Sequence, residues 1–209
     1  TIYIAVTGVQ TCALPISMLE VNQFTLQLDS FHFFLLVLST ICVTAAGYVI
    51  NDYFDTHTDW LNRPGEVLIG TKIHRRFAMI FHILLNFIGI GVGLYISFHI
   101  GMPYLGLLFL LTAGVLWFYS TTYKRQFLTG NLIVAILTAL VPLMVVVFEV
   151  PMLNQEYHDV LVRNKMNFMF ILNWILAFSF FAFLTNLMRE IIKDIEDYEG
   201  DKIYGRKSL

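Results

Sequence analysis

The segment Phe31–Ile50 reads FHFFLLVLSTICVTAAGYVI, and Asn51–Asp59 follows it directly as NDYFDTHTD. The first part carries no Asp, Glu, Lys or Arg and has the roughly 20-residue length of a helix that crosses the hydrocarbon core of a bilayer. Four further apolar segments have the same character: Phe77–Ile100, Leu105–Tyr123, Leu128–Val150 and Phe168–Met188. We therefore predict an all-α fold, a polytopic membrane helical bundle with about five transmembrane helices.

The composition supports this class. Hydrophobic residues make up 57% of the chain, charged residues 13%, and the mean hydropathy is +0.70, whereas a soluble domain has about 25% charged residues. We expect an integral membrane protein in contact with lipid. Nothing in the sequence indicates nucleic-acid binding, and two cysteines give no disulfide framework.

Two acidic clusters follow apolar segments. In helical geometry, acids spaced three or four residues apart share a face and repel one another. One such stripe contains Asp52, Asp55 and Asp59, and the other contains Glu190, Asp194, Asp197 and Asp201. A stripe of this kind is either a solvated helix end or a site that cations neutralise, and Mg²⁺ prefers carboxylate oxygens together with water and substrate phosphates.

Basic residues predict the topology. Regions 51–76, 120–127 and 189–209 alternate through five helices onto one side and hold eleven of the thirteen Lys and Arg residues. The opposite side has Arg163 and Lys165 in the loop Pro151–Asn167. By the positive-inside rule, the basic side is cytoplasmic, and both acidic clusters lie there. Carboxylates that bind Mg²⁺, surrounded by Lys and Arg, are the chemistry of a diphosphate site.

The motifs resemble those of the UbiA-type intramembrane prenyltransferases over roughly residues 31–209. Asn51, Asp52, Asp55 and Asp59 match the family's NDxxDxxxD motif. The run Asp197-Tyr198-Glu199-Gly200-Asp201, with Asp194 one turn earlier, resembles the second acidic motif. Tyr119 and Lys124 resemble the YxxxK element with a gap one residue longer.

The resemblance implies a nine-helix family fold, of which these helices resemble the second through the sixth. The chain is then a piece of that fold, with residues 18–209 as a partial prenyltransferase domain. Residues 1–17 resemble a translated sequencing adapter, and we expect them to be non-native.

The resemblance also implies site residues. The expected Mg²⁺ ligands are Asn51, Asp52, Asp55, Asp59, Asp194, Asp197 and Asp201, of which Asp52, Asp55, Asp194 and Asp197 are the catalytic acids. The expected diphosphate ligands are Arg63, Lys72, Tyr119 and Lys124.

The sequence of Arg189–Asp197 resembles that of the family branch that transfers a geranylgeranyl group from its diphosphate to geranylgeranylglycerol phosphate. Prenyl transfer to an aromatic quinone precursor is the alternative acceptor chemistry. A transporter is disfavoured because its ionisable residues would lie near the bilayer midplane, and an inactive remnant is disfavoured by the intact acids. The expected location is the cytoplasmic membrane of a bacterium or archaeon, with the site facing the cytoplasm.

Overall fold

The computed structural model describes residues 24–62, 67–126, 128–164 and 168–196, and these residues are mostly helical. Five helices or helical segments are long and apolar enough to cross a membrane, which confirms the predicted fold class. The long helices are α2 (Ser30–Asn62), α3 (Arg75–His99), α4 (Leu107–Thr121), α5 (Thr129–Glu156) and α7 (Met169–Glu196). Short helical turns precede and follow α4, at η1 (Pro103–Gly106) and η2 (Tyr123–Arg125).

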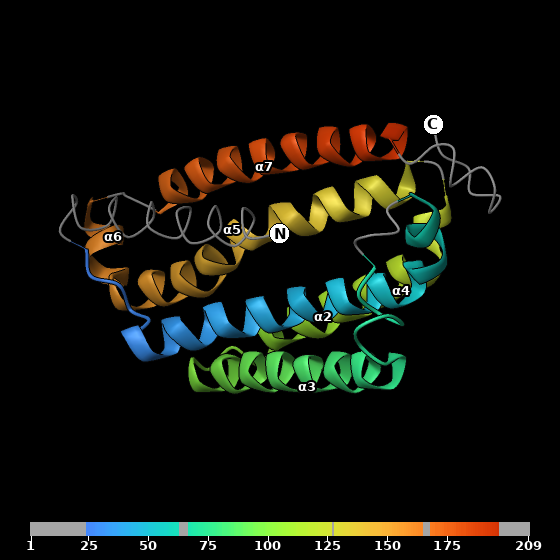
Figure 1. Ribbon diagram of the computed structural model, residues 1–209. Coiled ribbons are helices and arrows are strands. Elements are labelled where there is room, and N and C mark those ends of the chain that lie inside the picture. The colour runs from blue at the N-terminus through green and yellow to red at the C-terminus, as the bar shows by residue number, and fades with distance from the viewer. Residues whose placement is uncertain (1–23, 63–66, 127, 165–167, 197–209) are drawn as a thin grey trace.

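The helices pack as two pairs with α4 between them. Helix α2 packs most extensively on α3, and α5 packs most extensively on α7, while α4 contacts α2, α3 and α5 (Figure 1). The carboxyl-terminal ends of α2 and α7 lie at the same end of the bundle (Figure 1). The helix ends that carry the acidic clusters are therefore at the same end of the bundle (Figure 1).

Two clusters of buried apolar side chains lie between the helices. One core cluster joins α2, α3, α4 and α5 and includes Leu36, Ile96, Phe109 and Phe148. The other joins α5 and α7 and includes Val146, Leu153, Ile171 and Ile175. Side chains that pack in this way fix the distance between neighbouring helices, because protein interiors are close-packed.

Small and polar residues hold α2 against α3. A Cβ atom at Gly89 would lie 2.7 Å from Val43 Cγ2 and 3.1 Å from the Ser39 carbonyl oxygen, so only glycine fits there. The Ser39 hydroxyl donates to the Gly89 carbonyl oxygen at 2.5 Å, and His82 Nδ1 lies 2.9 Å from the Ala46 carbonyl oxygen. Close approach and interhelical hydrogen bonds are the usual means of association between membrane helices.

Helix α2 extends well beyond the predicted segment Phe31–Ile50 because no proline interrupts it before Pro64. The residues Asn51–Asp59 are therefore helical, and their acids do share a face. Arg75, at the start of α3, fixes this end. Its guanidinium lies 4.4 Å from the Tyr53 ring centroid and donates to the Tyr53 carbonyl oxygen at 3.3 Å.

At the other end of the bundle, the predicted loop Pro151–Asn167 is partly helical. Helix α5 continues through Pro151 to Glu156, and the short helix α6 (His158–Asn164) follows. Helices near membranes tolerate proline when other groups satisfy the freed backbone. The buried carboxylate of Glu149 accepts hydrogen bonds from the backbone N–H groups of Gln27, at 2.5 Å, and Leu28, at 3.1 Å, and so fixes the chain before α2.

The glycines of α3 give a matched test of this packing. Gly89→Ala should lower the free energy of unfolding by about 1–3 kcal/mol, because its methyl group would overlap Val43. Gly91→Ala meets nothing within 4 Å, so it should be neutral or stabilise the helix by up to about 1 kcal/mol. Thermal unfolding in detergent measures both, and an equal loss for the two variants would contradict the packing described here.

Candidate functional site

An elongated cavity of about 210 Å³ runs along the helices of the bundle. Its walls come from single faces of α2, α4 and α5. Helix α2 contributes Thr40, Thr44, Tyr48 and Asp52, which lie one turn apart. Helix α4 contributes Phe109, Thr112, Leu116 and Tyr119, and α5 contributes Val134, Leu137, Val141 and Met144. These rows span about 15–18 Å of helix, so the cavity is a channel parallel to the bundle.

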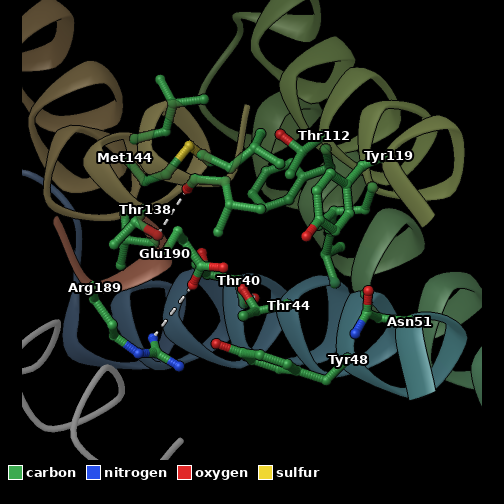
Figure 2. Close-up of a pocket in the computed structure, with 18 of the residues that line it drawn as sticks. Thr40, Thr44, Tyr48, Asn51, Thr112, Tyr119, Thr138, Met144, Arg189 and Glu190 are labelled. Atoms are coloured by element: carbon green, nitrogen blue, oxygen red, sulfur yellow. Dashed lines mark hydrogen bonds and ion pairs between the residues drawn. The ribbon is translucent and has the colours of Figure 1, made fainter. Parts of the chain in front are cut away.

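Polar groups gather at one end of this channel. Asn51, Asp52 and Tyr119 lie there, and α7 adds Arg189, Glu190 and Lys193. Tyr119 and Glu190 face one another across the open space (Figure 2). The deeper part is bounded mainly by aliphatic side chains and Phe109. The cavity is thus amphipathic, with charge at one end and apolar walls at the other.

A lysine joins the first acidic cluster to the turn after α4. Lys124, in η2, forms an ion pair with the Asp55 carboxylate, and its Nζ donates to the Asn51 amide oxygen at 3.1 Å. Asp55 is only 2% exposed. A buried carboxylate without compensation would be costly, so this contact fixes where the end of α2 sits relative to α4 and α5.

The remaining acids of this stripe are crowded. Burial and the neighbouring Asp55 carboxylate raise the pKa of Asp59 to about 6, while Lys124 and Lys193 act in the opposite direction. Lys193 on α7 and Asp52 on α2 both line the cavity, so both helices contribute to its polar end. Burial is the larger cause of the Asp59 pKa shift and the Asp55 carboxylate the second, so a further cation beside Asp59 would favour its charged form.

The second acidic cluster lies on α7. Asp194 accepts a hydrogen bond from the amide nitrogen of the buried Asn131 on α5 at 2.7 Å. Glu190, one turn earlier, is 8% exposed, and its Oε1 lies 4.0 Å from Arg189 Nη1. Helix α5 therefore orients the acids of α7, in the way that Lys124 orients those of α2.

The predicted site residues fall into three groups. The structure gathers Asn51, Asp52, Asp55, Asp59, Tyr119, Lys124 and Asp194 around the polar end of the channel. Lys72 is exposed on the connection between α2 and α3 and does not line the cavity. Arg63, Asp197 and Asp201 lie outside the described residues. Within the described ranges, no three His, Cys, Asp or Glu side chains are close enough to hold a metal ion alone.

Sequence reasoning did not include several groups at this site. Asn131 is one, although a buried amide just inside the start of an apolar helix is a signal that could have singled it out. Tyr48 is another, because it lies one turn before Asp52 on the same face of α2. Arg189 and Lys193 also line the cavity, beside the acids of α7.

The chain is similar in sequence to several named proteins. Digeranylgeranylglyceryl phosphate synthase of Methanosphaera stadtmanae is 35% identical over 184 residues, which cover 82% of this chain and 58% of the relative. The enzyme of the same name from Methanothermobacter thermautotrophicus is 32% identical over 181 residues, covering 86% of this chain and 56% of the relative. The chain therefore spans little more than half the length of these relatives.

The fold agrees with this similarity. A solved structure described as digeranylgeranylglyceryl phosphate synthase in membranes superposes with a TM-score of 0.65 at 27% identity, covering 99% of this chain and 62% of that chain. The sequence profile of the UbiA prenyltransferase family matches residues 20–209. This match takes in both acidic clusters and the channel between them, and the chain belongs to the UbiA prenyltransferase family.

Proposed function

We propose that the full-length protein transfers an isoprenyl group from its diphosphate to a lipophilic acceptor. The observation that carries this proposal is the channel itself, which joins an acid-rich polar end to an apolar interior. A diphosphate suits the first part and an isoprenoid chain suits the second. The names of the relatives support the same reaction class.

For the substrates, we propose geranylgeranyl diphosphate as donor and geranylgeranylglycerol phosphate as acceptor. The relatives named digeranylgeranylglyceryl phosphate synthase support this pair. Arg189 and Lys193 add two cations on the α7 side of the cavity, apart from Lys124 on the α4 side. Cations on two sides of the polar end suit two anionic substrates, a diphosphate and a phosphate-bearing acceptor. An aromatic quinone precursor is the second candidate acceptor.

The residues at the polar end have the ligand atoms that Mg²⁺ prefers, because α2 offers carboxylate and amide oxygens and α7 offers carboxylate oxygens. Mg²⁺ is usually held by one or two carboxylates together with substrate phosphates and water, so a group of three protein ligands is not required. Asp52, Asp55 and Asp59 on one side and Asp194 on the other would hold it, with Asp197 and Asp201 as further proposed ligands. When bound, Mg²⁺ would act as a Lewis acid on the departing diphosphate.

In the proposed reaction, the bond from the isoprenyl C1 atom to the diphosphate oxygen breaks, and its electron pair leaves with the diphosphate. The acceptor hydroxyl oxygen bonds to C1 and gives up its proton. Lys124 supplies positive charge beside the leaving group, and Arg63 is a further proposed diphosphate ligand. Lys72, which does not line the cavity, has no role in this proposal. Tyr119 lies at the same end as a hydrogen-bond donor. Glu190, a buried carboxylate at the cavity wall, is the group we assign to receive the acceptor proton. The apolar walls exclude water from the allylic cation.

A transporter is the competing class. Two charged residues of the described spans lie far from the acidic end: Glu156, which is exposed at the last residue of α5, and Glu149, which is engaged by two backbone N–H groups. Glu149 therefore serves the fold rather than a transport path, and the remaining acids lie close to one interface.

We further propose that the acidic end faces the cytoplasm, as the positive-inside rule indicates. In a variant without the native cysteines, Thr71→Cys should react with a membrane-impermeant maleimide only after cell lysis. Gln155→Cys, at the opposite end of the bundle, should react in intact cells. Both positions are exposed. The reverse pattern would place the site on the outer face.

Carboxylate variants test the proposed catalysis. Asp52→Asn and Asp194→Asn keep the shape of the side chain but lose its charge, so pyrophosphate release from geranylgeranyl diphosphate should fall by at least about a hundredfold. Asp159→Asn is the control, because this side chain is 98% exposed near the other end of the bundle. Release should stop with a chelator and return with added Mg²⁺. Wild-type rates in both site variants would show that these acids do not assist the reaction.

Lys124 should be structural as well as functional. Lys124→Ala removes a charge partner of the buried Asp55 carboxylate and should destabilise the protein by about 3–5 kcal/mol. The double variant Lys124→Ala with Asp55→Asn should recover most of this loss, because no buried charge is left to compensate, yet it should stay inactive. Thermal unfolding of the two single variants and the double variant measures the coupling, and additive losses would mean that the ion pair does not hold the site.

A further inference from the structure

The channel ends at an aromatic side chain. Counted from Asp52 and Tyr119 at the polar end, the lining rows finish at Thr40 on α2 and Phe109 on α4, about 15–18 Å away along the helices. The row on α5 finishes at Met144. All three residues lie in the middle parts of their membrane spans. The channel thus reaches about halfway through the bundle.

Packed core lies beyond this end. Phe109 is 2% exposed and belongs to the same apolar cluster as Leu36, Ile96 and Phe148, which are 0–1% exposed. The Phe109 and Phe148 rings meet edge to face, with their centroids 6.1 Å apart. We call this end of the channel, at Phe109, the floor. Because the side chains behind it are fully buried and leave few voids, the Phe109 ring has little room to move away from the channel.

A glycine on α3 provides the seat for this ring. A Cβ atom at Gly93 would lie 2.3 Å from Phe109 Cδ2 and 2.6 Å from its Cγ and Cε2. The ring therefore rests directly on the backbone of α3. Any larger residue at position 93 would push the ring away from α3 and toward α5 and the channel.

The walls above the floor suit a hydrocarbon despite their threonines. The Thr40, Thr44 and Thr138 hydroxyl groups donate to the carbonyl oxygens of Leu36, Thr40 and Val134, each four residues earlier on the same helix, at 2.8–2.9 Å. These hydroxyl donors are satisfied within their own helices, so a hydrocarbon bound in the channel leaves none of the three without a partner.

We propose that Phe109, seated on Gly93, sets the longest isoprenyl chain that the site accepts. This inference rests on the proposed function, because it assigns the channel to the isoprenyl chain of the donor. The chain would extend from its diphosphate at the polar end toward Phe109, and one additional isoprenyl unit would meet the packed core. Phe109 is then a specificity residue of the site and takes no part in the chemical step.

Three variants test this inference in the full-length protein with farnesyl, geranylgeranyl and geranylfarnesyl diphosphates. The measured quantity is pyrophosphate release, expressed as ratios of kcat/KM between donors. Phe109→Leu opens space at the floor and should raise the ratio of geranylfarnesyl to geranylgeranyl diphosphate by about tenfold or more. Phe118→Leu is the matched control, since it makes the same change on the same helix at a side chain that is 59% exposed. Its ratios should equal those of the wild type.

Gly93→Ala should act in the opposite direction. By pushing the ring into the channel, it should raise the ratio of farnesyl to geranylgeranyl diphosphate. If this variant does not fold, Phe109→Trp, which enlarges the floor itself, takes its place with the same expectation. Ratios unchanged from wild type in Phe109→Leu would overturn the inference, as would a wild type that accepts all three donors equally. In both cases the proposed function survives if the wild type releases pyrophosphate, whereas no release from any donor with any acceptor would refute the proposed function itself.

Discussion

The ion pair between Lys124 and Asp55 joins the end of α2 to the turn that leads from α4 into α5. Asp55 is buried, so its charge must be compensated at that place and not simply by solvent. Because Lys124 also donates to Asn51, the contact sets both the depth and the rotation of the acidic stripe on α2. The hydrogen bond from Asn131 to Asp194 does the same for α7. Both acid-bearing helices are thus held in place by residues at, or just before, the start of α5.

Two further buried carboxylates, Glu149 and Glu190, differ in their surroundings. Glu149 accepts from two backbone N–H groups and ties the chain before α2 to α5. Glu190 is almost equally buried, but it faces the cavity and has the guanidinium of Arg189 only at 4.0 Å. An acid whose oxygens are engaged by backbone donors stabilises a fold. An acid at the wall of a cavity remains available to a ligand, and this difference in partners assigns the first to structure and the second to the site.

The sequence predicts much of this fold because two of its signals are local. The apolar lengths give the five spans, and the three- and four-residue spacing of the acids gives the stripe on α2. Contacts between helices are not local. Gly89, Gly91 and Gly93 look alike in the sequence, yet Gly89 and Gly93 receive neighbouring side chains while Gly91 meets nothing within 4 Å. The pairing of Asn131 with Asp194 and the position of Phe109 at the end of the channel likewise depend on how α4, α5 and α7 are rotated, which no periodicity encodes.

Helix α4 is the shortest of the long helices, yet it bounds both ends of the channel, with Tyr119 at the polar end and Phe109 at the floor. Three close contacts hold it in place. Gly93 receives the Phe109 ring, Gly47 receives Leu116, whose Cδ1 would lie 2.8 Å from a Cβ there, and Gly106, just before α4, receives Leu94 at 2.6 Å by the same measure. These contacts involve Gly106, Phe109 and Leu116, so α4 cannot slide along its neighbours without breaking them. The separation between Tyr119 and Phe109, about 15 Å along one helix, is therefore a rigid length. Under the proposed function, this length would limit the isoprenyl chain of a donor whose diphosphate is bound at the polar end.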